Sequence, residues 1–206
     1  MAGISVAEPV LGQERDVSPP PARPDFEIVP RKGLIVVAVV FVAVIVAIAS
    51  NKLWPLMFLH VAGGAAWTII DLFLGLILGP ILGRLSIPAR IELTTKLMPK
   101  ILLIMPTVVT VALAAGWQLG NKLGFVFSQY PNHGWVVASY IVVGIMAIIA
   151  LGLLEPANIA VLVELKKPQP RPEVIERLMK RFIYSAGIIG VLQIATLVIM
   201  TKLASG

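Results

Sequence analysis

The chain has 206 residues, of which 58% are hydrophobic and only 14% are charged, and its mean hydropathy is +0.92. A chain of this composition has too little polar surface to cover a soluble fold, so soluble globular classes are excluded. The absence of cysteine excludes disulfides, thiolate metal sites and iron–sulfur ligation. The net charge is +6, and the basic residues lie beside apolar runs. Membrane orientation and binding of anionic lipid explain this placement better than nucleic-acid binding does.

The chain divides into a polar tail and an apolar remainder. Residues 1–32 are rich in proline and have no apolar core of their own, which predicts a disordered or extended tail. Residues 33–206 contain five apolar runs that are long enough to cross a bilayer. We therefore predict an all-α, polytopic membrane bundle with transmembrane helices at about 33–50, 54–84, 98–119, 135–165 and 182–203.

Basic residues alternate between the two sides of this predicted bundle. Lysine and arginine gather in the tail, in the segment after the second span and in the segment after the fourth span. The other loops and the C-terminus hold only Lys52, Lys122 and Lys202. The positive-inside rule therefore places the N-terminus and the tail in the cytoplasm and the C-terminus on the exoplasmic side.

The second span carries the most informative pattern. His60, Trp67 and Asp71 fall on one helix face, because offsets of seven and eleven residues return nearly to the same angle. Glycines recur every four residues further along this span, at Gly75, Gly79 and Gly83. This spacing of small residues lets membrane helices pack closely. A polar face and a glycine ridge together predict that this helix lies at the centre of the bundle.

Ionisable residues inside membrane spans are costly and indicate functional sites. The predicted topology places Asp71, Glu155 and Lys100 in the cytoplasmic half, which predicts an intramembrane polar cluster. In one interpretation the carboxylates pair with Lys100 and Arg84 and have a structural role. In another they form a proton relay or a transport site, although no internal repeat is detectable and many transporter folds consist of two similar halves.

His60 forms a second, outer polar zone. A neutral histidine in a helical bundle is a common ligand of haem or copper. Side chains at a similar depth that could complete such a site are Met57, Gln118, His133 and Met200. The alternative is that His60 only hydrogen-bonds to a neighbouring helix, and both interpretations stay open.

Leu59-His60 followed by Trp67, a glycine-rich stretch, Arg84 and Lys96-Leu97-Met98-Pro99-Lys100 resembles the CopD/HemJ-like group of bacterial inner-membrane proteins. It is also similar to related uncharacterised integral membrane families, and the resemblance covers about residues 54–120. It implies that His60 binds haem b or copper and that Lys96 or Lys100 matches a third-helix lysine. The HemJ branch is associated with protoporphyrinogen oxidation. The tail and the five spans depart from its usual four-helix form, which argues against carrying that activity over.

The sequence thus favours a multi-pass inner-membrane protein that is a non-catalytic subunit or small-ligand binder of a redox- or copper-linked membrane complex. Its expected partners are the lipid bilayer and either other membrane subunits or further copies of itself. Two alternatives remain. One is a haem b-binding membrane oxidoreductase or electron carrier that uses His60. The other is a transporter or proton-relay protein that uses Asp71 and Glu155.

Overall fold

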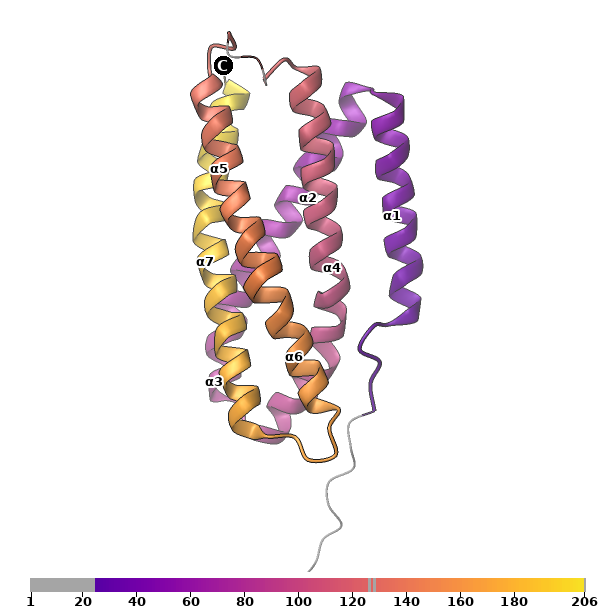
Figure 1. Ribbon diagram of the computed structural model, residues 1–206, viewed down its shortest axis with the longest axis vertical. Coiled ribbons are helices and arrows are strands. Elements are labelled where there is room, and N and C mark those ends of the chain that lie inside the picture. Colours follow the sequence, from indigo (N-terminus) through magenta and orange to yellow (C-terminus); the bar gives the residue numbers. More distant parts are fainter. Residues whose placement is uncertain (1–24, 126, 128, 206) are drawn as a thin grey trace, which may run out of the picture.

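The computed structural model describes residues 25–125, 127 and 129–205, and these residues form a helical bundle without strands (Figure 1). Five helices are long and apolar enough to cross a membrane, which confirms the predicted all-α class and agrees with the five predicted spans. In chain order the elements are α1 (Arg31–Ser50), α2 (Leu53–Leu72), η1 (Phe73–Leu78), α3 (Gly79–Arg84), α4 (Ile87–Lys122), α5 (His133–Ile149), η2 (Ala150–Leu154), α6 (Glu155–Leu165) and α7 (Pro172–Ser205). The segments η1 and η2 are π-helical.

The helices extend beyond the predicted spans at one end. α4 begins at Ile87 and α7 at Pro172, so the predicted spans 98–119 and 182–203 cover only the apolar part of each helix. Hydropathy detects the segment that lies in hydrocarbon, whereas a helix can continue into water once its first turns have formed. The polar turns that hydropathy assigned to loops therefore belong to the two longest helices.

The tail predicted for residues 1–32 is described only from residue 25 onward, and residues 1–24 lie outside the described residues. α1 already begins at Arg31. Just before it, Phe26 and Ile28 pack against the hydrophobic core, and the Lys166 ammonium nitrogen lies 5.3 Å from the centroid of the Phe26 ring. The described end of the tail therefore packs on the bundle rather than extending away from it.

Both π-helical segments directly precede a proline in the next helix. η1 ends just before Gly79-Pro80, and η2 ends just before Glu155-Pro156. Proline donates no backbone hydrogen bond and its ring clashes with the carbonyl four residues earlier. A π-helical turn widens the helix locally and accommodates this clash. Pro80 and Pro156 therefore lie next to wide turns within helices that continue past them.

The two hairpins that follow α1 have a similar order of elements. The first hairpin, residues 53–122, consists of a span with a π-helical segment and a proline, followed by a long return helix. The second hairpin, residues 133–205, has the same architecture. Near the start of the return helices, Lys96-Leu97-Met98 corresponds to Arg177-Leu178-Met179, and both methionines are buried. The similarity is in architecture and a few residues, which is why the sequence did not reveal it.

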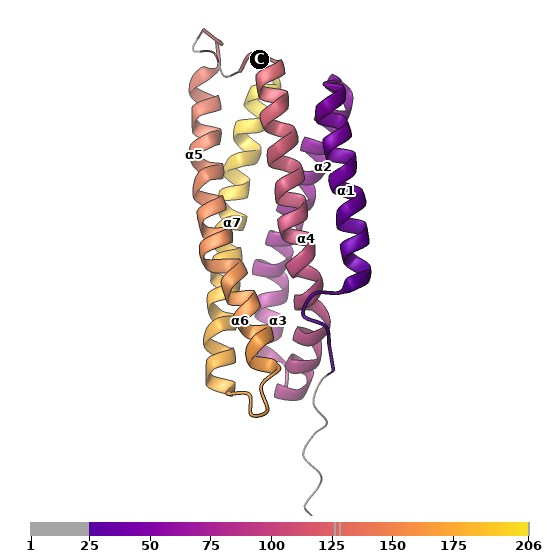
Figure 2. The same cartoon turned by 45° about the vertical axis from the view of Figure 1, so that its right-hand side comes forward.

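α1 lies outside the two hairpins, alongside α4 (Figure 2). Only Val44 and Ala47 of α1 are buried, and Ala47 packs with Leu56 and Leu119. The main core instead lies between the hairpins and includes Trp67 and Met146. α1 is therefore a peripheral helix on a four-span core.

The glycine ridge predicted on the second span meets α7 at two of its three positions. A Cβ atom at Gly75 would lie 2.9 Å from the Cα of Gly187, and one at Gly79 would lie 2.7 Å from a methyl carbon of Ile183. A Cβ at Gly83 would meet nothing within 4 Å. The ridge therefore brings η1 and the start of α3 against the second hairpin.

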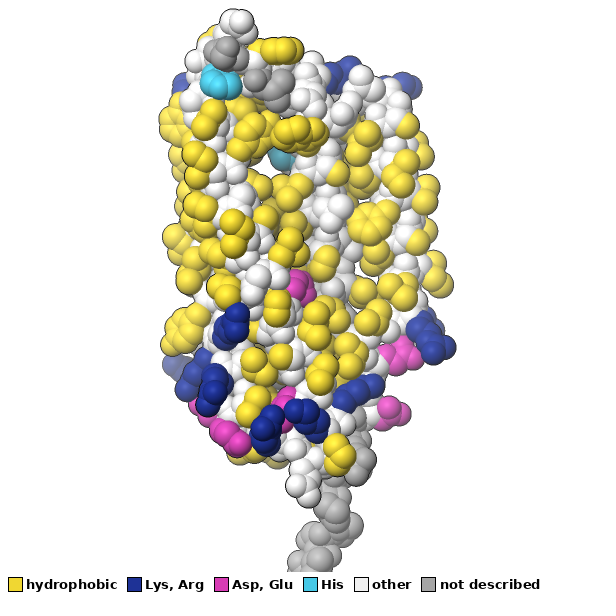
Figure 3. Space-filling model, viewed as in Figure 1, with side chains coloured by type: hydrophobic (Ala, Val, Ile, Leu, Met, Phe, Trp, Pro, Cys, Tyr) yellow, Lys and Arg dark blue, Asp and Glu magenta, His cyan; other side chains and the backbone are white. Residues whose placement is uncertain are grey.

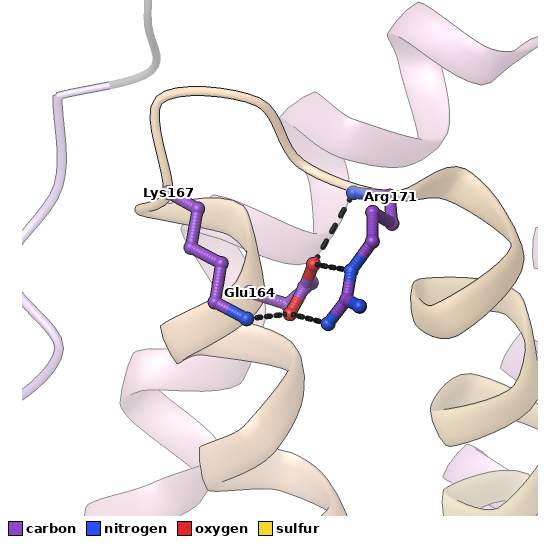
Figure 4. A network of polar contacts seen from close by, with 3 residues as sticks. All are labelled: Glu164, Lys167 and Arg171. Carbon is purple, nitrogen blue, oxygen red and sulfur yellow. Dashed lines mark hydrogen bonds and ion pairs between the residues drawn. The ribbon is translucent and has the colours of Figure 1, made fainter.

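Lysine and arginine side chains gather at the end of the bundle where α3, α6 and the start of α7 lie (Figure 3). We call this the basic end. There the buried Glu164 carboxylate accepts hydrogen bonds from the Arg171 backbone N–H (3.3 Å), from Arg171 Nε (3.0 Å) and from Lys167 Nζ (Figure 4). The carboxylate raises the pKa of the Arg171 guanidinium. This network joins α6 to α7 across the intervening loop.

We predict that Gly75→Ala destabilises the protein by about 1–3 kcal/mol, because the added methyl meets backbone that cannot rotate away. Gly83→Ala is the matched control. Its methyl enters open space, so the better helix propensity of alanine should leave stability unchanged or raise it by up to about 1 kcal/mol. Thermal unfolding in detergent measures both, and equal stability of the two variants would contradict the close packing at Gly75.

Candidate functional site

The main candidate site lies between the two hairpins, inside the hydrophobic belt. Asp71 comes from α2, Glu155 and Asn158 from α6, and Gln193 from α7. Asp71 and Asn158 are 0% exposed and Gln193 is 3% exposed, while Glu155 is half-buried. Gln193 and Glu155 lie near Asp71, and Asn158 follows Glu155 by about one turn of α6. We call these four residues the acid–amide cluster. Figure 3 shows an acidic side chain among hydrophobic side chains, above the charged side chains of the basic end.

Neighbouring side chains position the cluster. The Thr68 hydroxyl lies 2.8 Å from Gln193 Oε1 and 2.9 Å from the Gly64 carbonyl oxygen, so it ties α7 to α2. With Oε1 held by Thr68, the amide nitrogen of Gln193 remains as the donor. Trp67 and Gln193 lie near the Asp71 carboxyl without a formed hydrogen bond to it. Trp67 precedes Asp71 by one helical turn, as the predicted common face requires.

The cluster is short of hydrogen bonds. Both Asp71 oxygens, both Glu155 oxygens, both polar side-chain atoms of Asn158 and the Gln193 amide nitrogen are buried without a partner among the described residues. Trp67 Nε1 is likewise unpaired, so its approach to Asp71 stops short of a formed bond. Unsatisfied buried polar groups each cost about 1–3 kcal/mol. Native proteins keep few of them, and such a concentration indicates a site for a ligand.

The ion pair expected between Asp71 and Lys100 is not formed. Lys100 is exposed and lines a groove between α4 and α1, and Arg84 is exposed as well. The ion pairs among the described residues involve Glu92, Glu164 and Glu176. Of the predicted intramembrane polar cluster, Asp71 and Glu155 therefore lie near each other, whereas Lys100 belongs to another surface.

The chemistry open to this arrangement follows from its atoms. Two carboxylates without a cationic partner cannot both stay charged in a medium of low dielectric, so they take up protons or bind a cation. An additional unpaired oxygen comes from the side-chain amide of Asn158. Carboxylate and carbonyl oxygens suit hard cations rather than soft transition metals. No group of three His, Cys, Asp or Glu forms among the described residues.

His60 lies in the half of α2 away from the basic end. Its Nδ1 is 2.8 Å from the carbonyl oxygen of Ala112 on α4. A carbonyl can only accept, so Nδ1 carries the proton, and the lone pair of a neutral ring is then on Nε2. The ring packs over Gly116, where a Cβ would overlap the imidazole. This geometry matches the predicted hydrogen bond to a neighbouring helix.

The four side chains expected to complete a site at His60 differ in their contacts and in their positions along the helices. Gln118 Nε2 donates to Asn51 Oδ1 at 3.1 Å, and Met57 is exposed. His133 begins α5 and Met200 lies near the end of α7. Among these four residues, none makes a described hydrogen bond to His60.

Sequence reasoning missed Thr68, Asn158 and Gln193 as members or neighbours of the site. One feature of the sequence could have indicated the two amides, because a side-chain amide in an apolar span needs a partner inside the bundle. Asn158 follows Glu155 by three residues, which places both on one helix face. Which helix Gln193 faces could not be read from its own span.

Comparison of this chain with protein-family models, curated proteins and solved structures finds no match. The resemblance to the CopD/HemJ-like group therefore stays a prediction from the residues that carry it.

Proposed function

We propose that this multi-pass membrane protein binds a small hard cation at the acid–amide cluster, with protons as the competing occupant, and exchanges the two across the bilayer. The observation that carries the proposal is Asp71, which is fully buried and has no hydrogen-bond partner for either oxygen. A buried carboxyl of this kind favours a proton or a cation as its occupant. Its presence is explained if an occupant neutralises it.

Electrostatics favours a cation over an anion or a neutral solute. No basic side chain pairs with Asp71 or Glu155 among the described residues, so the ionised site would carry two negative charges. At an effective dielectric constant of about 20, a cation 4 Å from one carboxylate is attracted by about 4 kcal/mol. Protonation removes this attraction, so proton binding and cation binding oppose each other.

The location of the cluster supports exchange across the membrane. Asp71 belongs to the first hairpin, and Glu155, Asn158 and Gln193 belong to the second. Transporters built from repeats commonly bind their substrates near the midplane, where the repeats meet and helices are irregular. Here η1 begins two positions after Asp71 and η2 ends just before Glu155.

The positive-inside rule supports a cytoplasmic basic end, a cytoplasmic N-terminus and an exoplasmic C-terminus. The resemblance to CopD/HemJ-like proteins supports the bacterial inner membrane as the location. At about 1.5 Å per residue, Asp71 then lies roughly 20 Å along the helix from Arg84, and Glu155 roughly 15 Å from Leu165. The exposed apolar face of α1 is compatible with service as a subunit of a larger membrane complex.

We predict that Asp71→Asn abolishes cation–proton exchange and leaves the protein folded, because asparagine keeps the shape and removes the charge. Stability without cation should stay within about 1 kcal/mol of the wild type. Proteoliposomes with an imposed pH gradient and a trapped pH dye measure exchange with Na⁺, K⁺ or Mg²⁺. Glu155→Gln should weaken it as well.

The control for Asp71→Asn is Glu92→Gln, which removes one carboxylate from an exposed pair with Lys96. It should exchange cations like the wild type. If Asp71→Asn retained wild-type exchange, or if wild-type protein dissipated no pH gradient with any of the three cations, the proposed function would be wrong.

A second candidate function rests on the tautomer of His60. Metal-ligating histidines usually donate their other ring N–H to a carboxylate or backbone carbonyl, as His60 does to Ala112. We infer that His60 Nε2 is the atom available to haem b or copper. When bound, either group would supply one-electron chemistry. The chain's own contribution would be to hold the ring in place against Gly116.

For this candidate we predict that protein purified from membranes shows a haem absorption band or contains copper, and that His60→Ala loses both while still inserting. Gly116→Ala should lower occupancy, because its methyl displaces the ring. Absorption spectra and metal analysis provide the measurement. Purified wild-type protein without haem or copper would leave His60 with a packing role only.

The orientation is tested with single cysteines at Asn132 and Gln169 in this cysteine-free chain. We predict that an impermeant thiol reagent labels position 132 in intact cells and position 169 only after lysis. A third cysteine at Ser18, which lies outside the described residues, should behave like position 169. Labelling of position 169 in intact cells would reverse the proposed orientation.

A further inference from the structure

A groove of about 380 Å³ lies between α1 and α4 and includes no residue of the proposed cation site. Gly33, Val36, Val37 and Val40 line its α1 side. α1 contacts the bundle tightly at two levels only. A Cβ at Gly33 would lie 2.7 Å from Leu103, and the buried residues Val44 and Ala47 lie further along the helix. The groove occupies the space between these levels.

The walls of the groove are mostly apolar away from one end, and the hydroxyl of their one threonine, Thr107, is bonded to the Leu103 carbonyl oxygen. On α4 they include Leu103, Ile104 and Val108, whereas Lys100 stands beside Pro30 and Gly33. Lys100 is exposed and has no ion pair among the described residues. Arg31 and Lys32 begin α1 next to it and are exposed. One end of the groove is thus strongly basic, and the rest can accept only hydrocarbon.

We propose that this groove is a binding site for an anionic phospholipid, with one acyl chain between α1 and α4 and the phosphate group at Lys100. Anionic lipid headgroups bind basic pockets between membrane helices at the cytoplasmic surface. The groove runs along helices that are long and apolar enough to cross a membrane, so lipid tails are the available apolar occupant. A peptide segment would instead require partners for its backbone polar groups.

The lipid also accounts for the position of α1. This helix buries little surface against the bundle, and the space at its centre would otherwise leave apolar side chains without contacts. An acyl chain there fills the space and holds α1 at its observed distance from α4. The site is independent of the acid–amide cluster, so it stands whether or not the protein transports cations.

Native mass spectrometry and thermal unfolding of the full chain in detergent test the proposal, with phosphatidylglycerol and phosphatidylcholine as the added lipids. We expect phosphatidylglycerol to bind more tightly and to raise the unfolding temperature more. Lys100→Gln should weaken its binding roughly fivefold, the factor that corresponds to about 1 kcal/mol for one basic residue at an anionic surface. Ile104→Trp should reduce retention of both lipids by filling the groove.

The matched control is Arg181→Gln. Arg181 occupies the position of Lys100 in the second hairpin, in the pair Lys96–Lys100 and Arg177–Arg181, and it is exposed but does not line this groove. Its variant should bind phosphatidylglycerol like the wild type. The proposal is overturned if the two lipids bind equally, if Arg181→Gln loses as much as Lys100→Gln, or if inorganic phosphate stabilises the protein as well as the lipid does.

Discussion

The close approach of η1 and α7 is the contact on which the rest of the structure depends. Gly75 faces the backbone of Gly187 at a distance that admits no side chain. Helices in a bilayer gain little from hydrophobic association, so they depend on such packing and on interhelical hydrogen bonds. This contact joins the two hairpins, and the Thr68–Gln193 hydrogen bond continues the same interface. Asp71 becomes buried because α7 lies this near.

The prolines act on the same interface through the backbone. Inside hydrocarbon each peptide group must find its hydrogen bond within its own helix, so Pro80 and Pro156 distort the helix without ending it. The resulting π-helical turns lie next to the two carboxylates. A wide turn carries weaker and less regular hydrogen bonds than an α-helix, and π-helical turns occur frequently at functional sites. The irregular backbone and the two unpaired carboxyl groups therefore lie next to each other along the helices.

The acidic residues of this protein fall into two physical classes. Glu164 is buried but fully bonded to Lys167 and Arg171 (Figure 4), which is the pattern of a structural clamp. Asp71 is equally buried and has neither a cation nor a donor in place. The same side-chain chemistry thus has opposite consequences at the two sites. The hydrogen bonds of Glu164 hold a loop in place. The unpaired carboxyl of Asp71 can instead form favourable interactions when a ligand binds.

The sequence by itself determined the all-helical class, the five helices that are apolar enough to cross a membrane, and the common face of Trp67 and Asp71. These depend on hydropathy and helix period along one segment. Only the tertiary structure decided that Asp71 lies near Gln193 rather than Lys100 and that His60 bonds to Ala112. These contacts depend on which helices are neighbours and on how each helix is rotated about its own axis. Apolar spans surrounded by lipid carry almost no pattern that distinguishes one neighbour from another.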